Sequence, residues 1–166
     1  MTKLIVFDYP VLVSESQDPG ALVAVEALRS DGWTIAIVSN QGHCDVSKAH
    51  EDIQATADLF GIELAAFCPV EDGSEMISLA KINGQWRDSR VTPSGFEALF
   101  GAAIPDINFW LPNTGMLLFS QERSNLEGGD RCLFVSEHFI DFPNTNADDF
   151  QFVFAHEWRS ESTLST

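Results

Sequence analysis

Short apolar runs that end abruptly on polar residues recur along this chain, and they predict β-strands. Residues 4–7 form such a run before Asp8, and residues 34–38 form another before Ser39-Asn40-Gln41. A loop is expected directly after Asp8, and a helix from 18 to about 30, opened by Asp-Pro-Gly, joins the two strands. Strands joined by a helix in this way run parallel. Open parallel sheets bind ligands beyond the carboxyl ends of their strands, where these polar residues lie.

The alternation of strands and helices continues with one interruption. A helix is predicted at 45–60, ended by Gly61, and a third strand at 63–68. The arms 76–82 and 85–91 flank Asn83-Gly84, a strong hairpin signal, and a helix follows to about residue 100. We therefore expect residues from about 70 to 110 to form an insertion rather than part of the main sheet. The last predicted elements are a helix at 114–126 and strands at 131–135 and 149–155, with Ala147 on a short helix or turn between these strands.

Together these elements predict one domain, residues 1–166, with an α/β fold. Its architecture is expected to be a doubly wound, Rossmann-like, mainly parallel sheet with an inserted hairpin and helix segment. A chain of this length, with 45% hydrophobic residues, is large enough to bury a core. Cys68 and Cys132 fall within strand-like runs and are expected to be small buried residues.

The composition adds a strongly acidic charge. The chain has 25 Asp and Glu against nine Lys and Arg, a formal charge of −16. This charge repels phosphate backbones, so we expect no nucleic-acid binding. It serves either solubility, as in a salt-rich cytoplasm, or attraction to a basic partner surface. No stretch approaches the ~20 apolar residues of a membrane span, and three cysteines without paired spacing fit a reducing compartment, so a cytoplasmic protein is expected.

Asp8 is the first candidate for chemistry. A carboxylate at the end of a strand can attack phosphorus or bind Mg²⁺. The alternative is a residue that caps a helix or forms a turn after the strand. The pattern alone leaves both interpretations open.

Further motifs place Asp8 in a recognisable order. Asp8 after four apolar residues, Ser39-Asn40-Gln41 about thirty residues later, and Ser136-Glu137 with Asp141 resemble the haloacid dehalogenase (HAD) superfamily. The sequences Leu-Pro-Asn-Thr-Gly-Met-Leu at 111–117 and Phe-Val-Phe-Ala-His-Glu-Trp at 152–158 are similar to its capless branch of polynucleotide 3′-phosphatases and histidinol-phosphate phosphatases. The resemblance implies an HAD-type fold and Mg²⁺-dependent phosphate chemistry.

The resemblance also implies roles for individual residues. Asp8 matches the nucleophile that forms an aspartyl-phosphate, Ser39 the hydroxyl that holds the phosphoryl group, and Asn40 could assist. The Mg²⁺ ligands would be the Asp8 carboxylate, the backbone carbonyl of Pro10 and the carboxylates of Glu137 and Asp141. Glu137 is one methylene longer than the aspartate of the family, and the alternative for this pair is a solvated Glu and an N-capping Asp.

Two helper residues of the family are missing. Pro10 stands where the family has its acid/base aspartate, a group worth roughly 10²–10⁴ in rate. Leu111 stands where the family has its phosphate-binding lysine, which removes a cation from the site. Lys48 could replace that lysine, although a solvated helix lysine is the commoner arrangement.

Three functions remain open from the sequence. The first is a pseudophosphatase or very weak phosphatase that works as a binding or regulatory module, with a small phosphorylated ligand or a protein as partner. The second is an active Mg²⁺-dependent phosphohydrolase that uses Asp8 as nucleophile. The third is a structural or assembly protein that contacts a basic partner.

Overall fold

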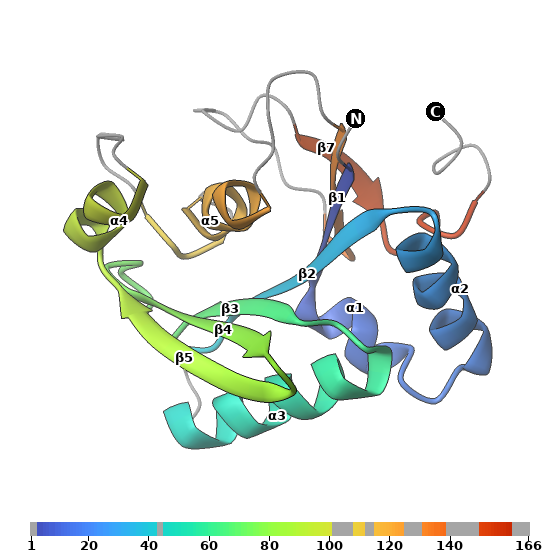
Figure 1. Ribbon diagram of the computed structural model, residues 1–166, viewed down its shortest axis with the longest axis horizontal. Coiled ribbons are helices and arrows are strands. Elements are labelled where there is room, and N and C mark those ends of the chain that lie inside the picture. The colour runs from blue at the N-terminus through green and yellow to red at the C-terminus, as the bar shows by residue number, and fades with distance from the viewer. Residues whose placement is uncertain are drawn as a thin grey trace.

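The computed structural model describes residues 3–42, 45–100, 108–111, 115–124, 131–138 and 150–160. These residues form one seven-stranded sheet with helices packed on both of its faces (Figure 1). The strands are β1 (Lys3–Asp8), β2 (Trp33–Asn40), β3 (Leu64–Cys68), β4 (Met76–Ile82), β5 (Gln85–Val91), β6 (Arg131–Ser136) and β7 (Phe150–Phe154). The helices are α1 (Tyr9–Ser14), α2 (Pro19–Ser30), α3 (Val46–Phe60), α4 (Pro93–Phe100) and α5 (Gly115–Arg123).

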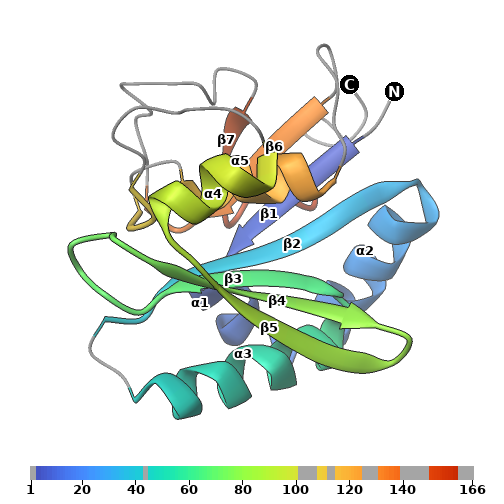
Figure 2. The ribbon, with the colours of Figure 1, turned by 60° about the vertical axis from the view of Figure 1, so that its left-hand side comes forward.

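The sheet is mixed, and its strand order is β5-β4-β3-β2-β1-β6-β7. The five strands β3-β2-β1-β6-β7 run parallel to one another. Strand β4 pairs antiparallel with β3 and with β5. The predicted α/β class is therefore confirmed. Figure 2 shows the hairpin of β4 and β5 running along the edge of the sheet beside β3.

The position of this hairpin corrects one expectation. The hairpin itself forms as predicted, and Asn83 and Gly84 adopt the left-handed backbone of its turn, with φ of 53° and 78°. It is not separate from the main sheet, however, because Leu64 to Phe67 of β3 pair in register with Ala80 to Ile77 of β4. An antiparallel hairpin can extend a parallel sheet because the edge strand still offers free N–H and C=O groups.

Two hydrophobic clusters cover the two faces of the sheet. Alternate residues of β1 divide between them, so that Ile5 and Phe7 face α1, α2 and α3, while Leu4 and Val6 face α4 and α5 (Figure 1). Strands that are buried on both faces explain the continuous apolar runs in the sequence. Trp158 is fully buried in the first cluster and meets Phe7 edge to face, with ring centroids 5.0 Å apart.

The ends of α2 and α3 follow the signals in the sequence. Asp18 caps α2 by accepting a hydrogen bond from the Gly20 N–H at 2.8 Å, and Asp45 caps α3 through the Lys48 N–H at 3.1 Å. Gly61 ends α3 in the left-handed conformation, with φ of 65°.

The prediction of a loop directly after Asp8 is wrong, because helix α1 begins at Tyr9. Pro10 fits the first turn of this helix, where its missing N–H costs nothing, and Val11 and Leu12 are buried against the sheet. Strand β2 extends two residues beyond the predicted end and includes Ser39 and Asn40.

Two further expectations concern the cysteines and the membrane. Cys68 and Cys132 are buried, as predicted. Among the described helices, none is long and apolar enough to cross a bilayer. Ala147 lies outside the described residues.

Candidate functional site

The carboxyl ends of β1, β2 and β6 bring the predicted site residues to one edge of the sheet. In the strand register Asp8 lies opposite Val38 of β2, one residue before Ser39. Phe7 lies opposite Val135 of β6, so that Ser136 follows at the level of Asp8. Because these three strands are parallel neighbours, their terminal side chains share one edge, as the sequence predicted.

The Asp8 carboxylate is bound across the sheet by a serine. The Ser136 hydroxyl donates a hydrogen bond of 2.9 Å to Asp8 Oδ2, and Ser136 is only 1% exposed. The backbone N–H of His138 in turn donates to Ser136 Oγ at 3.3 Å. Asp8 occupies the N-cap position of α1, but its side chain makes no capping hydrogen bond. The carboxylate therefore binds across to the neighbouring strand.

The sequence pattern included Ser136 without giving it a role. A polar residue that directly follows a buried strand was a signal that could have been used. The partner of that residue is 128 positions away, however, and only the strand register identifies it.

Burial controls the ionisation of Asp8. Removal of the carboxyl group from water raises the pKa of Asp8 above its ordinary value of 3.8. The hydrogen bond from Ser136 and the positive potential of His138 lower the pKa, and the negative charge of Glu137 raises it again. Burial is the largest of these effects, so the site favours the neutral carboxyl more than water does.

The Ser39-Asn40-Gln41 motif is occupied by contacts within the protein. Ser39 is 2% exposed, and its hydroxyl oxygen accepts a hydrogen bond of 2.8 Å from the Gln41 side-chain amide. The Asn40 side-chain amide makes two hydrogen bonds to the backbone of Leu111. Asn40 Nδ2 donates to the Leu111 carbonyl at 3.0 Å, and the Leu111 N–H donates to Asn40 Oδ1 at 2.8 Å. We refer to these two bonds as the Asn40–Leu111 clamp. They use the amide groups that the resemblance assigned to phosphate binding.

The two candidate positions for a phosphate-binding cation lie in different environments. Leu111, at the position of the family's lysine, is buried in the cluster beside α4 and α5. Lys48 lies on the exposed surface of α3, where its Nζ contacts Asp52 Oδ1 at 2.5 Å one helical turn away. Its side chain is 65% exposed, as expected for a solvated helix lysine. The pKa of Lys48 is raised, chiefly by its hydrogen bond to Asp52.

The described residues do not by themselves form a magnesium site. Glu137 is exposed, although it lies near enough to Asp8 to affect its pKa. Pro10 lies in the first turn of α1, where a backbone carbonyl accepts the N–H four residues later in the helix. In the part of the chain that the structure describes, no three His, Cys, Asp or Glu side chains gather as metal ligands. Asp141 lies outside the described residues, so the predicted magnesium site stays a prediction.

Trp110 borders this edge of the sheet, a position that the sequence analysis did not predict. A Cβ atom on Gly42 would lie 2.9 Å from two ring carbons of Trp110 and 2.9 Å from Cγ of Glu71. The tryptophan therefore packs closely against the backbone that follows the Ser39-Asn40-Gln41 motif. His43 and Cys44, which follow this motif closely in the sequence, lie outside the described residues.

Neither a scan of protein-family models nor a search of curated protein sequences finds a match to this chain.

Proposed function

We propose that this protein is an HAD-type domain that has lost efficient phosphatase chemistry and works as a binding or regulatory module. The parallel strand order β3-β2-β1-β6-β7, with helices on both faces, supports the doubly wound arrangement that the motifs imply. The position of Asp8 at the carboxyl end of β1 supports the same assignment. A small phosphorylated molecule and a protein are the two classes of partner that we consider.

The observation that carries the proposal is the environment of the Asp8 carboxylate. A phosphatase nucleophile needs to be ionised and needs cations that offset the charge of the phosphoryl group. Asp8 accepts a hydrogen bond from the Ser136 hydroxyl, and burial raises the pKa of its carboxyl group. Among the described residues, the charged groups that affect its pKa are His138 and Glu137, and neither is a lysine or arginine.

A phosphatase assay tests the proposal directly. The protein is incubated with p-nitrophenyl phosphate, and separately with a 3′-phosphorylated oligonucleotide, each with Mg²⁺ and beside the Asp8→Asn variant. We expect little or no turnover, and the same residual rate in both proteins. Turnover that Asp8→Asn abolishes would exclude the pseudophosphatase. A calorimetric titration with Mg²⁺ alone then shows whether the carboxylates at this edge bind the metal.

Restoring the missing groups provides a second test with the opposite sign. Pro10 is exposed, so Pro10→Asp introduces a proton donor beside Asp8 without removing buried surface. Leu111→Lys adds a cation where the clamp fixes the backbone, at the cost of burying part of a charged side chain. In an eroded phosphatase we expect the double variant, and to a lesser extent Pro10→Asp alone, to gain rate toward the 10²–10⁴ that a proton donor contributes. Folded variants without any gain would count against the assignment.

One observation favours the active phosphohydrolase as the second candidate. Asp8 makes no capping hydrogen bond to α1, so the helix does not use the carboxylate. In that case Mg²⁺ would supply the positive charge that the described residues lack. The assay with Asp8→Asn separates the two candidates.

A further inference from the structure

Strand β5 forms one edge of the sheet, and all of its residues are described. It pairs with β4 on one side, and among the described residues no strand pairs with its other side (Figure 2). Residues 85 and 87–90 are exposed, so a second strand can reach this edge. A strand with a free side offers N–H and C=O groups that can pair with another chain.

The hairpin turn decides which residues of β5 direct their backbone groups outward. In a two-residue hairpin of this type, the residues on either side of the turn exchange backbone hydrogen bonds, and bonded and non-bonded pairs alternate from there. The odd-numbered residues of β5 therefore bond to β4. The Ser78 hydroxyl on β4 agrees with this direction, because it donates to the Ser89 carbonyl at 3.4 Å. The even-numbered residues, Asp88 and Arg90 among them, consequently direct their N–H and C=O groups to the free side.

Asp88 and Arg90 also share one face of the sheet. Opposite them on β4 are Leu79 and Ile77, which belong to the hydrophobic cluster on the face of α3. Arg90 forms an ion pair with Glu75 at 3.0 Å, and in the described part of the chain Asp88 forms no ion pair. Charged residues keep an edge strand unpaired when like charges would meet across it. Asp88 and Arg90 carry opposite charges, so each can attract the other in a second copy.

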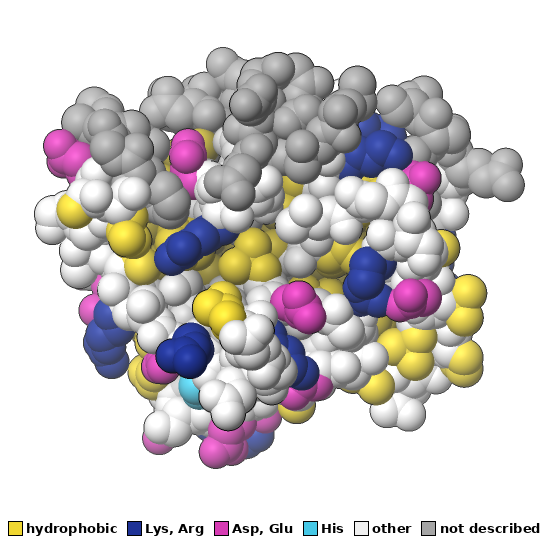
Figure 3. Space-filling view, in the orientation of Figure 1, with side chains coloured by type: hydrophobic (Ala, Val, Ile, Leu, Met, Phe, Trp, Pro, Cys, Tyr) yellow, Lys and Arg dark blue, Asp and Glu magenta, His cyan; other side chains and the backbone are white. Residues whose placement is uncertain are grey.

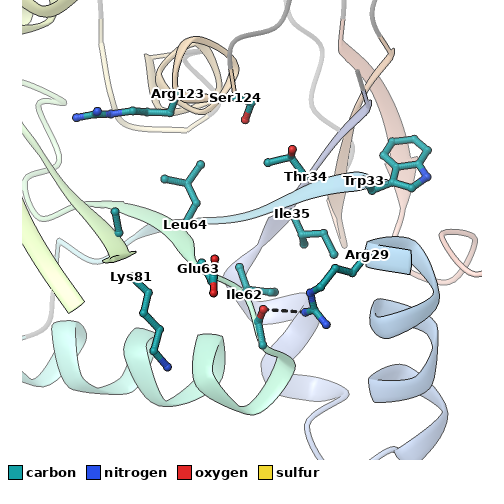
Figure 4. Close-up of a pocket in the computed structure, with 12 residues that line it drawn as sticks. Arg29, Trp33, Thr34, Ile35, Ile62, Glu63, Leu64, Lys81, Arg123 and Ser124 are labelled. Atoms are coloured by element: carbon teal, nitrogen blue, oxygen red, sulfur yellow. Dashed lines mark hydrogen bonds between the residues drawn. The ribbon is translucent and has the colours of Figure 1, made fainter. Parts of the chain in front are cut away.

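The neighbouring part of β5 is fixed within the protein. Trp86 Nε1 donates to Asp58 Oδ1 at 3.0 Å. Lys81, opposite Trp86 on β4, extends toward α3 and pairs with the same carboxylate at 2.8 Å (Figure 4). Strand β5 is therefore held in place before any partner binds. Figure 3 shows acidic and basic side chains interspersed over the surface of β5 and α3, so this side of the molecule is not uniformly acidic.

Symmetry selects one register for pairing of β5 with a second copy of itself. A two-fold axis makes the two strands antiparallel, and their outward groups pair only where even-numbered residues meet even-numbered ones. The axis must then pass through a residue. At Arg87, Asp88 or Arg90 it would place a charged side chain against its own copy. At Ser89 it places two serines together and Asp88 opposite Arg90 on both sides of the axis.

We propose that the edge of β5 is a self-association surface, at which a second copy of this chain extends the sheet by antiparallel pairing centred on Ser89. Asp88 of each copy pairs with Arg90 of the other, and each such pair exchanges both of its backbone hydrogen bonds. The Arg90 guanidinium has five N–H donors, so it can bind Glu75 and the incoming aspartate together. This surface is separate from the Asp8 edge and does not depend on the function proposed for it.

Sedimentation velocity of the full chain tests this surface at pH 7 and about 0.15 M salt, which screens repulsion between acidic copies beyond ~8 Å. We expect a dimer with a dissociation constant on the order of 10 µM, because a single pair of edge strands is a small interface. Asp88→Arg should weaken the dimer at least tenfold, since arginine then meets Arg90 in both pairs. The same variant lowers the net negative charge, so repulsion between acidic copies alone predicts the opposite result. Glu122→Arg makes the same change of charge at an exposed position of α5 and should not weaken the dimer.

Charge exchange separates this register from any other contact. Arg90→Asp alone should also weaken the dimer at least tenfold. The double variant Asp88→Arg/Arg90→Asp should associate at least tenfold more tightly than either single variant. An equimolar mixture of the two single variants should form a heterodimer at concentrations at which neither associates alone, because each copy then presents the charges that the other lacks. Circular dichroism checks that each variant is folded.

Amide hydrogen exchange tests the same pairing in the unchanged protein. The N–H groups of Asp88 and Arg90 should exchange at least tenfold more slowly in the dimer than in the monomer, whereas those of Arg87 and Ser89, which bond to β4, should be protected in both. Any of three results would overturn the proposal. They are a monomer up to a concentration of about thirty times the expected dissociation constant, association that folded charge variants leave unchanged or that charge exchange does not restore, and exchange at Asp88 and Arg90 that does not slow on association.

Discussion

The Asn40–Leu111 clamp gives the sharpest test of how this site is built. Asn40→Ala removes two hydrogen bonds that join the end of β2 to a segment 71 residues later. It also leaves the N–H and the carbonyl of Leu111 without these partners, next to a side chain that is only 7% exposed. A buried polar group that loses its partner costs about 1–3 kcal/mol, and water that enters reduces the cost.

For two such groups we expect Asn40→Ala to lower the free energy of unfolding by about 2–4 kcal/mol. This is a large part of the 5–15 kcal/mol that is typical of a domain. At about 2–4 °C for each kcal/mol in a chain of this length, the midpoint of thermal unfolding should fall by roughly 4–16 °C.

Urea unfolding followed by circular dichroism measures this loss. Gln54→Ala is the control, because it removes an amide of α3 whose side-chain contact is His50, and a change of this kind usually costs less than about 0.5 kcal/mol. A titration with inorganic phosphate on the same proteins provides the contrast. If Asn40 is a ligand-binding residue, its loss will weaken phosphate binding and leave the stability nearly unchanged. That result would refute the structural role assigned to the clamp.

Three further predictions concern stability. Gly73→Ala should lower the free energy of unfolding by about 2–4 kcal/mol, because a Cβ at this residue, which has a φ of 69°, would lie 1.8 Å from Asn108 Oδ1. Gly84 has a φ of 78° but open space around it, so Gly84→Ala should lower the free energy of unfolding by only the ~1–2 kcal/mol that the left-handed backbone costs. Urea unfolding of the two variants compares these values. Trp158→Ala should cost about 3–5 kcal/mol in the same assay, and Trp158→Phe should cost less because it keeps a ring against Phe7. Asp8→Asn should raise the stability at pH 7. Burial raises the pKa of Asp8, so the folded state binds a proton more tightly than the unfolded state, and ionisation of Asp8 at pH 7 destabilises the fold. The gain in stability should shrink as the pH falls through the raised pKa and disappear below pH 3.8. Asp72→Asn should show the opposite sign, because hydrogen bonds from Ser74 lower the pKa of Asp72, and equal pH profiles for the two variants would contradict this account.

The parts of the fold that could be predicted from the sequence depend on local signals. Runs of apolar residues predicted β1 and β2, an Asp-Pro-Gly sequence predicted the start of α2, and Asn83-Gly84 predicted the hairpin turn. Each signal acts within a few residues, through burial, capping or a left-handed backbone. Helix α1 was missed for the same reason, since Pro10 and the end of a strand resemble a loop until the burial of Val11 and Leu12 is known.

The contacts that define the candidate site are not local. Ser136 meets Asp8 over 128 residues, and Asn40 meets Leu111 over 71. One sequence contains no signal for such pairs, because many polar side chains could meet once the strands align. Sequence analysis could therefore place Asp8, Ser39 and Ser136 at one edge of the sheet, but it could not show which of their polar atoms are already bound.

These partners also constrain how the site could have changed. Polar groups at a buried edge must find hydrogen bonds where no ligand or cation provides them, because each orphaned group costs free energy. At this edge Ser136 binds Asp8, Gln41 binds Ser39, and Asn40 binds the backbone of Leu111. A phosphoryl group would have to displace the first two of these contacts before it gained any of its own. Pro10→Asp alone therefore adds a proton donor to a site in which Asp8 and Ser39 are held in other hydrogen bonds. If the proposed function is right, we expect substantial phosphatase activity only when a cation at position 111 is added to attract the phosphate.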